Sequence, residues 1–271
     1  MAELVELKHP REGVVLVEMN LSESDGFVSW AAVSALADAL AASRGQGTRV
    51  AVLASAVPDR WYEHAWLVDL RKGVAGEPTS GPADGWFRAL AEIASPDLVT
   101  IAAISGDCSG GGAELGWACD LRVAEEQAMF RQPEVFLGLS TGIGGTSRLS
   151  RLIGRTATAE MIFDGGPMSA RRIHELGGLN RVVPRGEAVA VSLAWASRLA
   201  DRPPGALVAA KKILNNAEEQ PLEDALAQEQ ETFLTTLISE EAAAGMKRAS
   251  DRFSAGEKVR DVYGDDGERE R

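Results

Sequence analysis

Residues 99–146 read VTIAAISGDCSGGGAELGWACDLRVAEEQAMFRQPEVFLGLSTGIGGT, and the rest of the chain is organised around this stretch. Its β-branched apolar start, residues 99–104, predicts a strand buried on both faces. Gly110, Gly111 and Gly112 then join this strand to AELGWA, which has helical composition. Glycines let a backbone approach a ligand closely, and the first amides of a helix have no partner within it. We therefore expect an anion-stabilising turn at the end of the strand.

Two glutamates lie close to this turn in the sequence. Glu114 follows Gly111 by three residues and so lies on roughly the same helix face. Glu134 directly follows Pro133, which prevents a regular helix from running through the segment. Taken singly, three glycines usually form a tight turn, and a glutamate is usually solvated. The ordered combination favours a pocket in which two carboxylates face the amides of the turn.

Three segments of the chain resemble a known family. GGGAELGWACDLRVA, FRQPEVFLGLSTGIGGTSRLSRLIG and MSARRIHELGGLNRVVP are similar to the enoyl-CoA hydratase/isomerase family, also called the crotonase superfamily. The dense part of the resemblance covers residues 98–184, and a looser part extends over most of the chain. The resemblance implies an α/β fold, with a crotonase-like ββα spiral core and a helical C-terminal region.

Pattern and resemblance together predict three parts of the chain. Residues 1–195 form the crotonase-like core domain, and residues 196–253 form a helical C-terminal oligomerisation region. The tail, residues 254–271, is charged and poor in apolar residues, so we expect part of it to be disordered. In the family such a helical region builds trimer contacts, which implies a homotrimer or a dimer of trimers, that is, a hexamer.

Composition narrows the class of protein. The chain has 271 residues with 45% hydrophobic content, enough for one large domain with a core. Its net charge of −12, from 40 acidic and 28 basic residues, argues against nucleic-acid or anionic-membrane partners. The two cysteines, Cys108 and Cys119, have no metal-like spacing with a histidine, so no metal site is expected. The sequence shows no signal segment or membrane-length apolar run, which predicts a cytoplasmic protein.

The resemblance assigns roles to four residues. Glu114 activates water, Glu134 donates a proton to the α-carbon, and the amides of Ala65 and Gly111 form the oxyanion hole. The substrate is then an acyl-CoA or acyl-carrier-protein thioester, with coenzyme A as part of the substrate and no separate cofactor. The intact glutamate pair favours an enoyl-CoA hydratase. Two alternatives stay open: another superfamily reaction, such as double-bond isomerisation or decarboxylation, and a catalytically weak acyl-thioester-binding protein.

The loop that carries Ala65 departs from the family pattern. It reads SAVPDRWYEHAWLVDL (residues 55–70), with a histidine and a tryptophan where relatives have glycine and aspartate beside the oxyanion residue. Ala65 can still donate its amide, because every residue except proline has one. Either the bulky side chains pack the loop against the core, or they line a reshaped acyl pocket. The pocket candidates are Trp61, Tyr62, His64 and Trp66, with His64 as an extra proton-transfer or hydrogen-bonding group.

Overall fold

The computed structural model of the chain describes residues 3–264, and these form two compact units that divide between Arg202 and Pro203. The sequence places the boundary at residue 195, which lies inside helix α7 (Ala188–Ala200). Ala188, Ala196 and Ala200 of this helix are buried against the sheet of the first unit. The whole of α7 therefore belongs to the core unit, and the unit ends after it.

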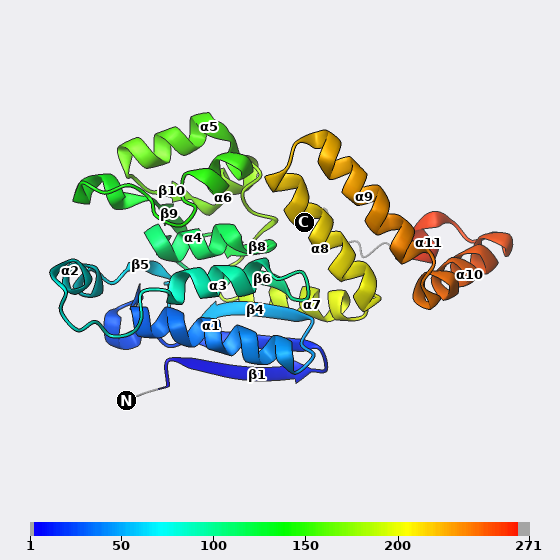
Figure 1. The fold of residues 1–271 in the computed structure, drawn as a ribbon, viewed down its shortest axis with the longest axis horizontal. Helices are drawn as coiled ribbons and strands as arrows, with labels where there is room; N and C mark the ends of the chain where they lie inside the picture. The colour runs from blue at the N-terminus through cyan, green and yellow to red at the C-terminus, as the bar shows by residue number, and fades with distance from the viewer. Residues whose placement is uncertain (1–2, 265–271) are drawn as a thin grey trace. The chain divides into compact units, whose positions relative to one another are not determined.

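The first unit is built on a six-stranded sheet in the order β1-β2-β4-β6-β8-β11 (Figure 1). The strands are β1 (Val5–Arg11), β2 (Val14–Met19), β4 (Val50–Ser55), β6 (Val99–Ile104), β8 (Leu121–Glu125) and β11 (Arg181–Val183). β1 and β2 form an antiparallel hairpin, and every other neighbouring pair is parallel. The buried central strand predicted at residues 99–104 is confirmed as β6.

Helices cover both faces of this sheet. Alternate strand residues such as Leu53 and Ala102 face the larger core beneath α1 (Trp30–Gly45), α3 (Gly85–Ala94) and α4 (Gly110–Ala118). Their neighbours, such as Val52 and Ala103, face α7 on the opposite side. Because side chains alternate along a strand, two apolar faces explain why these strands are apolar throughout. The predicted α/β fold is confirmed.

Two small sheets lie at the edge of the core and bring distant loops together. β3 (Phe27–Val28) pairs with β5 (Glu63–Ala65), and β9 (Met129–Arg131) lies between β7 (Cys108–Ser109) and β10 (Met168–Ser169). The remaining elements of this unit are η1 (Ser22–Ser24), α2 (Leu67–Ala75), η2 (Pro133–Leu137), α5 (Ser147–Asp164) and α6 (Ala170–Glu175). The small sheets place β5, the start of α4 and η2 around one space.

The second unit is helical, as predicted. It contains α8 (Pro204–Glu219), α9 (Leu222–Leu237), α10 (Glu240–Ser254) and α11 (Val259–Tyr263), and α8 packs against α9. The described part of the predicted tail contains α11, with Lys258 as its N-cap, while residues 265–271 lie outside the described residues. In the described part of the chain, no helix combines the length and apolar character needed to cross a membrane.

Candidate active site

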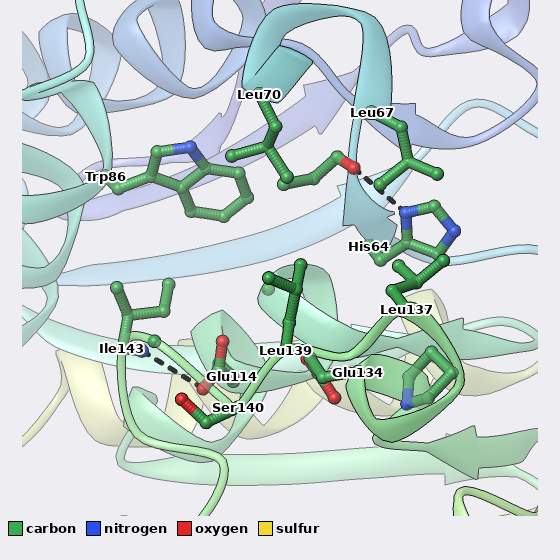
Figure 2. Close-up of a pocket in the computed structure, with 14 residues that line it drawn as sticks. His64, Leu67, Leu70, Trp86, Glu114, Glu134, Leu137, Leu139, Ser140 and Ile143 are labelled. Atoms are coloured by element: carbon green, nitrogen blue, oxygen red, sulfur yellow. Dashed lines mark hydrogen bonds between the residues drawn. The ribbon is translucent and has the colours of Figure 1, made fainter. Parts of the chain in front are cut away.

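A cavity of about 280 Å³ lies between β5, α3, the start of α4 and η2 (Figure 2). It brings together both predicted glutamates and both predicted oxyanion residues. Its lining consists of His64, Ala65, Leu67, Leu70, Trp86, Gly111, Glu114, Pro133, Glu134, Leu137, Leu139, Ser140, Gly142 and Ile143. Four separate stretches of the sequence thus meet at one mainly apolar cavity.

Glu114 is held in a fixed orientation by backbone amides. Its side chain comes from α4 and is only 2% exposed. Its Oε1 accepts hydrogen bonds from the amides of Ile143 (3.1 Å) and Gly145 (2.6 Å), while the other oxygen points into the cavity (Figure 2). Gly145 has little room for a side chain, because a Cβ there would lie 2.7 Å from the Thr141 methyl. The loop at residues 140–145 thus positions one carboxylate and leaves one oxygen available to a ligand.

Glu134 lies in η2, directly after Pro133. Burial raises the pKa of this carboxyl from 4.5 to about 7, and the nearby negative charge of Glu114 adds to the effect. Buried Gln132 lies between Glu134 and Trp117. Trp117 Nε1 can only donate, so the Gln132 amide oxygen accepts from it at 3.2 Å. The Gln132 nitrogen then lies 3.1 and 3.2 Å from Glu134 Oε1 and Oε2 and fixes that side chain.

The raised pKa of Glu134 predicts a pH-dependent stability difference for Glu134→Gln. The folded protein binds this proton more tightly than the unfolded chain, so ionising Glu134 costs stability as the pH rises from 4.5 through about 7. Glutamine has no charge to bury and escapes this cost. We expect thermal unfolding to show a larger gain for Glu134→Gln at pH 8 than at pH 5. An equal difference at both pH values would contradict the burial of an ionisable carboxyl here.

The Gly111 amide lies in the first turn of α4, where backbone amides have no partner within the helix. Close packing explains the glycines at this turn. Gly110 has φ +46°, and a Cβ on it would lie 2.7 Å from His64 Cβ. A Cβ on Gly112 would lie 2.1 Å from the Tyr62 carbonyl oxygen. The start of α4 thus rests directly on the backbone that leads into β5.

The hydrogen bonds around Ala65 support its predicted role as an amide donor. The amide of Glu63 donates to Gly26 O (2.9 Å), and that of Trp66 donates to Val28 O (2.9 Å), both across the β3–β5 pair. The His64 amide donates to Ser109 Oγ at 3.1 Å. The amides on both sides of Ala65 are therefore engaged elsewhere, and Ala65 itself lines the cavity.

Of the four predicted aromatic and histidine pocket residues, only His64 lines the cavity. Its Nδ1 lies 2.9 Å from the Ala65 carbonyl, which can only accept, so Nδ1 carries the hydrogen. When the ring is neutral, Nε2 is then an acceptor. His64 also packs against Phe27, with ring centroids 4.5 Å apart.

The assignment of Trp61, Tyr62 and Trp66 to the pocket is corrected by the structure. Trp61 and Tyr62 are fully buried and stacked on each other, and they donate to the carbonyls of Leu53 and Ala54 in β4. Trp66 lines a separate surface depression beside the N-terminal hairpin and α1. Trp61 and Tyr62 thus pack the loop against the core, which was the alternative interpretation, while Trp66 lies outside the cavity's lining.

Several residues of the site were not predicted. Trp86 on α3 is the tryptophan of the cavity, and its Cη2 would lie 3.0 Å from a Cβ on Gly111. The amides of Ile143 and Gly145 and the side chain of Gln132 hold the glutamates. The apolar face of the helix that carries Trp86 and the glycines at positions 142, 144 and 145 were the only signals available. Among the described residues, no group of His, Cys, Asp and Glu side chains forms a metal-binding cluster.

Comparison with known proteins identifies the family. The profile described as enoyl-CoA hydratase/isomerase matches residues 10–255, and the chain belongs to this family. The chain is 34% identical to a probable enoyl-CoA hydratase, echA8, of Mycobacterium bovis over 161 residues, which cover 59% of this chain and 63% of that protein. It is 36% identical to the 2,3-dehydroadipyl-CoA hydratase of Escherichia coli over 146 residues, 54% of this chain and 57% of that protein. Each alignment thus spans less than two thirds of the curated relative.

The fold matches solved structures over nearly the whole chain. Subunit I of an enoyl-CoA hydratase from Geobacillus kaustophilus superposes with a TM-score of 0.82 at 28% identity, covering 94% of this chain and 96% of that one. The enoyl-CoA hydratase from Polaromonas sp. JS666 gives 0.81 at 25% identity, covering 93% and 97%. The crotonase fold predicted from the sequence is therefore confirmed.

Proposed function

We propose that this protein is an enoyl-CoA hydratase-like carbon–oxygen lyase, which adds water to, or removes it from, an α,β-unsaturated acyl thioester. The observation that carries the proposal is the placement of Glu114 and Glu134 on one cavity with Ala65 and Gly111. Hydration needs a base for water, an acid for the α-carbon and donors for the enolate oxygen. This cavity offers all three.

The mechanism follows from the protonation of the two glutamates. The thioester oxygen accepts from the amides of Ala65 and Gly111, which draws electron density away from the double bond. Glu114 takes a proton from water as the water oxygen bonds to the β-carbon, and the π electrons move onto the thioester as an enolate. Glu134, whose pKa of about 7 keeps a large neutral fraction near pH 7, gives its proton to the α-carbon. Solvent then returns a proton to Glu134 and removes one from Glu114.

The lining of the cavity points to a compact acyl group. The volume is about 280 Å³, and Leu67, Leu70, Trp86, Leu139 and Ile143 supply apolar walls. Such walls favour a short hydrocarbon chain, and they discriminate chain lengths by about tenfold or more for each methylene. Which carrier the thioester uses, coenzyme A or a carrier protein, is decided by assay.

The function is tested by following loss of the conjugated enoyl thioester and identifying the product. Crotonyl-CoA, longer enoyl-CoA esters and crotonyl carrier protein serve as substrates. A 3-hydroxyacyl product supports hydration. A shifted double bond or released CO₂ from a suitable substrate would instead support the isomerase or decarboxylase alternative. Saturable binding of all thioesters without turnover would support the acyl-binding alternative.

We also propose that the protein assembles as a homotrimer or a dimer of trimers. The C-terminal unit exposes large apolar side chains, including Leu222 at 74% and Ile238 at 85%. Covering such side chains between subunits removes apolar surface from water. We expect sedimentation at micromolar concentration to give the mass of a trimer or hexamer. A stable monomer under these conditions would contradict this.

A further inference from the structure

Ser109 connects the two segments that carry the proposed oxyanion amides. It ends β7, directly before α4, and is only 3% exposed. Its Oγ accepts from the His64 amide (3.1 Å) and donates to Glu63 Oε2 (2.5 Å). The directions are fixed, because an amide nitrogen only donates and an ionised carboxylate only accepts. This buried hydroxyl thus makes one hydrogen bond as acceptor and one as donor, both with residues of β5.

The backbone repeats this connection. The Ser109 amide donates to the Tyr62 carbonyl at 3.2 Å, so Ser109 contacts the 62–64 segment through both its main chain and its side chain. His64 immediately precedes Ala65, and Ser109 lies two residues before Gly111. Ser109 therefore ties the backbone beside Ala65 to the backbone beside Gly111.

We infer that Ser109, oriented by Glu63, is a positioning residue that sets the spacing of the two oxyanion amides. The inference rests on the proposed function. Neither residue lines the cavity, so both act through the backbone they hold. The Glu63 carboxylate fixes the hydroxyl hydrogen, which directs a lone pair of Oγ at the His64 amide. Displacing a catalytic donor by about 1 Å is enough to cost about a hundredfold in rate.

Ser109→Ala is the first test, because it deletes both side-chain hydrogen bonds and adds no atoms to a tight interface. We expect kcat for the enoyl thioester to fall about ten- to a hundredfold, with a much smaller change in KM. Glu63→Gln keeps an oxygen that accepts from Ser109 and should retain most of kcat. Glu63→Ala lacks that acceptor and should behave like Ser109→Ala.

A spectroscopic readout separates positioning from general loss of structure. The carbonyl stretch of crotonyl-CoA labelled with ¹³C at the thioester carbon reports polarisation by the two amides. Its shift to lower frequency on binding should be large in the wild type and Glu63→Gln, and small in Ser109→Ala and Glu63→Ala. If Ser109→Ala does not fold, the two Glu63 variants decide the question.

Wild-type kcat and a wild-type carbonyl shift in Ser109→Ala or Glu63→Ala would overturn the inference while leaving the proposed function intact. Failure of the proposed function has a different signature, namely a wild-type protein that binds the thioester without hydrating it. The carbonyl shifts of the bound thioester still compare the variants in that case. A shift that is equal in all four proteins would then overturn the inference.

Discussion

Glu114→Gln and Glu134→Gln should each lower turnover of the enoyl thioester by about a hundredfold or more while the protein stays folded. Glutamine has nearly the size of glutamate, so neither change leaves a cavity. At position 114 the amide oxygen can still accept from Ile143 and Gly145, as Oε1 does now. The group that faces the cavity then has no basic oxygen for the water proton. At position 134 the proposed proton donor to the α-carbon is lost.

The matched control is Glu126→Gln, which makes the same chemical change at an exposed residue outside the cavity. Its rate should equal that of the wild type. The double variant at 114 and 134 should lose less than the product of the two single losses, because both groups serve one reaction. Wild-type rates in both single variants, on a substrate that the wild type hydrates, would contradict the assigned mechanism.

The pH profile adds a second signature to these variants. In the proposed mechanism Glu134 must be protonated for hydration, so kcat/KM in that direction should fall as the pH rises through about 7. Dehydration uses the ionised form and should show the opposite trend. The charge of Glu114 contributes to the raised pKa of Glu134, so Glu114→Gln should move the remaining limb to lower pH.

The motif at residues 99–146 and its family resemblance predicted the core fold and three of the four candidate site residues, because the glycines and acids occur in an ordered spacing. The loop at residues 55–70 was less predictable. The sequence shows that Trp61 and Tyr62 are bulky. Only the path of the folded chain shows that both side chains are hydrogen-bonded to carbonyls of β4. Ala65 has no distinctive side chain, and only the structure shows that it lines the cavity while the amides of its two neighbours bond to other groups.

Most of the other site features that the sequence did not predict depend on backbone amides. Ile143 and Gly145 hold Glu114 through their amides, and an amide has no side-chain signature in a sequence. Gln132 lies within the motif, but its role depends on a contact with Trp117 of α4, which the sequence does not show. The sequence placed the unit boundary at residue 195, inside α7, because the pattern of α7 resembles that of the helices after it. The packing of its alanines against the sheet assigns the whole helix to the core unit.

Gly111→Pro is expected to lower kcat by about a hundred- to a thousandfold, the usual cost of removing one oxyanion donor. Gly111 is the second residue of α4, in the first turn, where a backbone amide has no partner within the helix. The substitution therefore removes the proposed hydrogen-bond donor to the thioester oxygen without removing a helical hydrogen bond. Thermal unfolding and circular dichroism should show that the fold is retained.

Gly111→Ala is the matched variant, since alanine adds a Cβ as proline does but keeps the amide hydrogen. That Cβ would lie 3.0 Å from Trp86 Cη2, so the indole must shift by a few tenths of an ångström. We expect a modest loss in Gly111→Ala from this crowding, and a much larger one in Gly111→Pro. The ratio of the two kcat values isolates the amide from the effect of added bulk. Equal rates in the two folded variants would show that the Gly111 amide does not stabilise the enolate, and catalysis would then depend on Ala65 and the two glutamates alone.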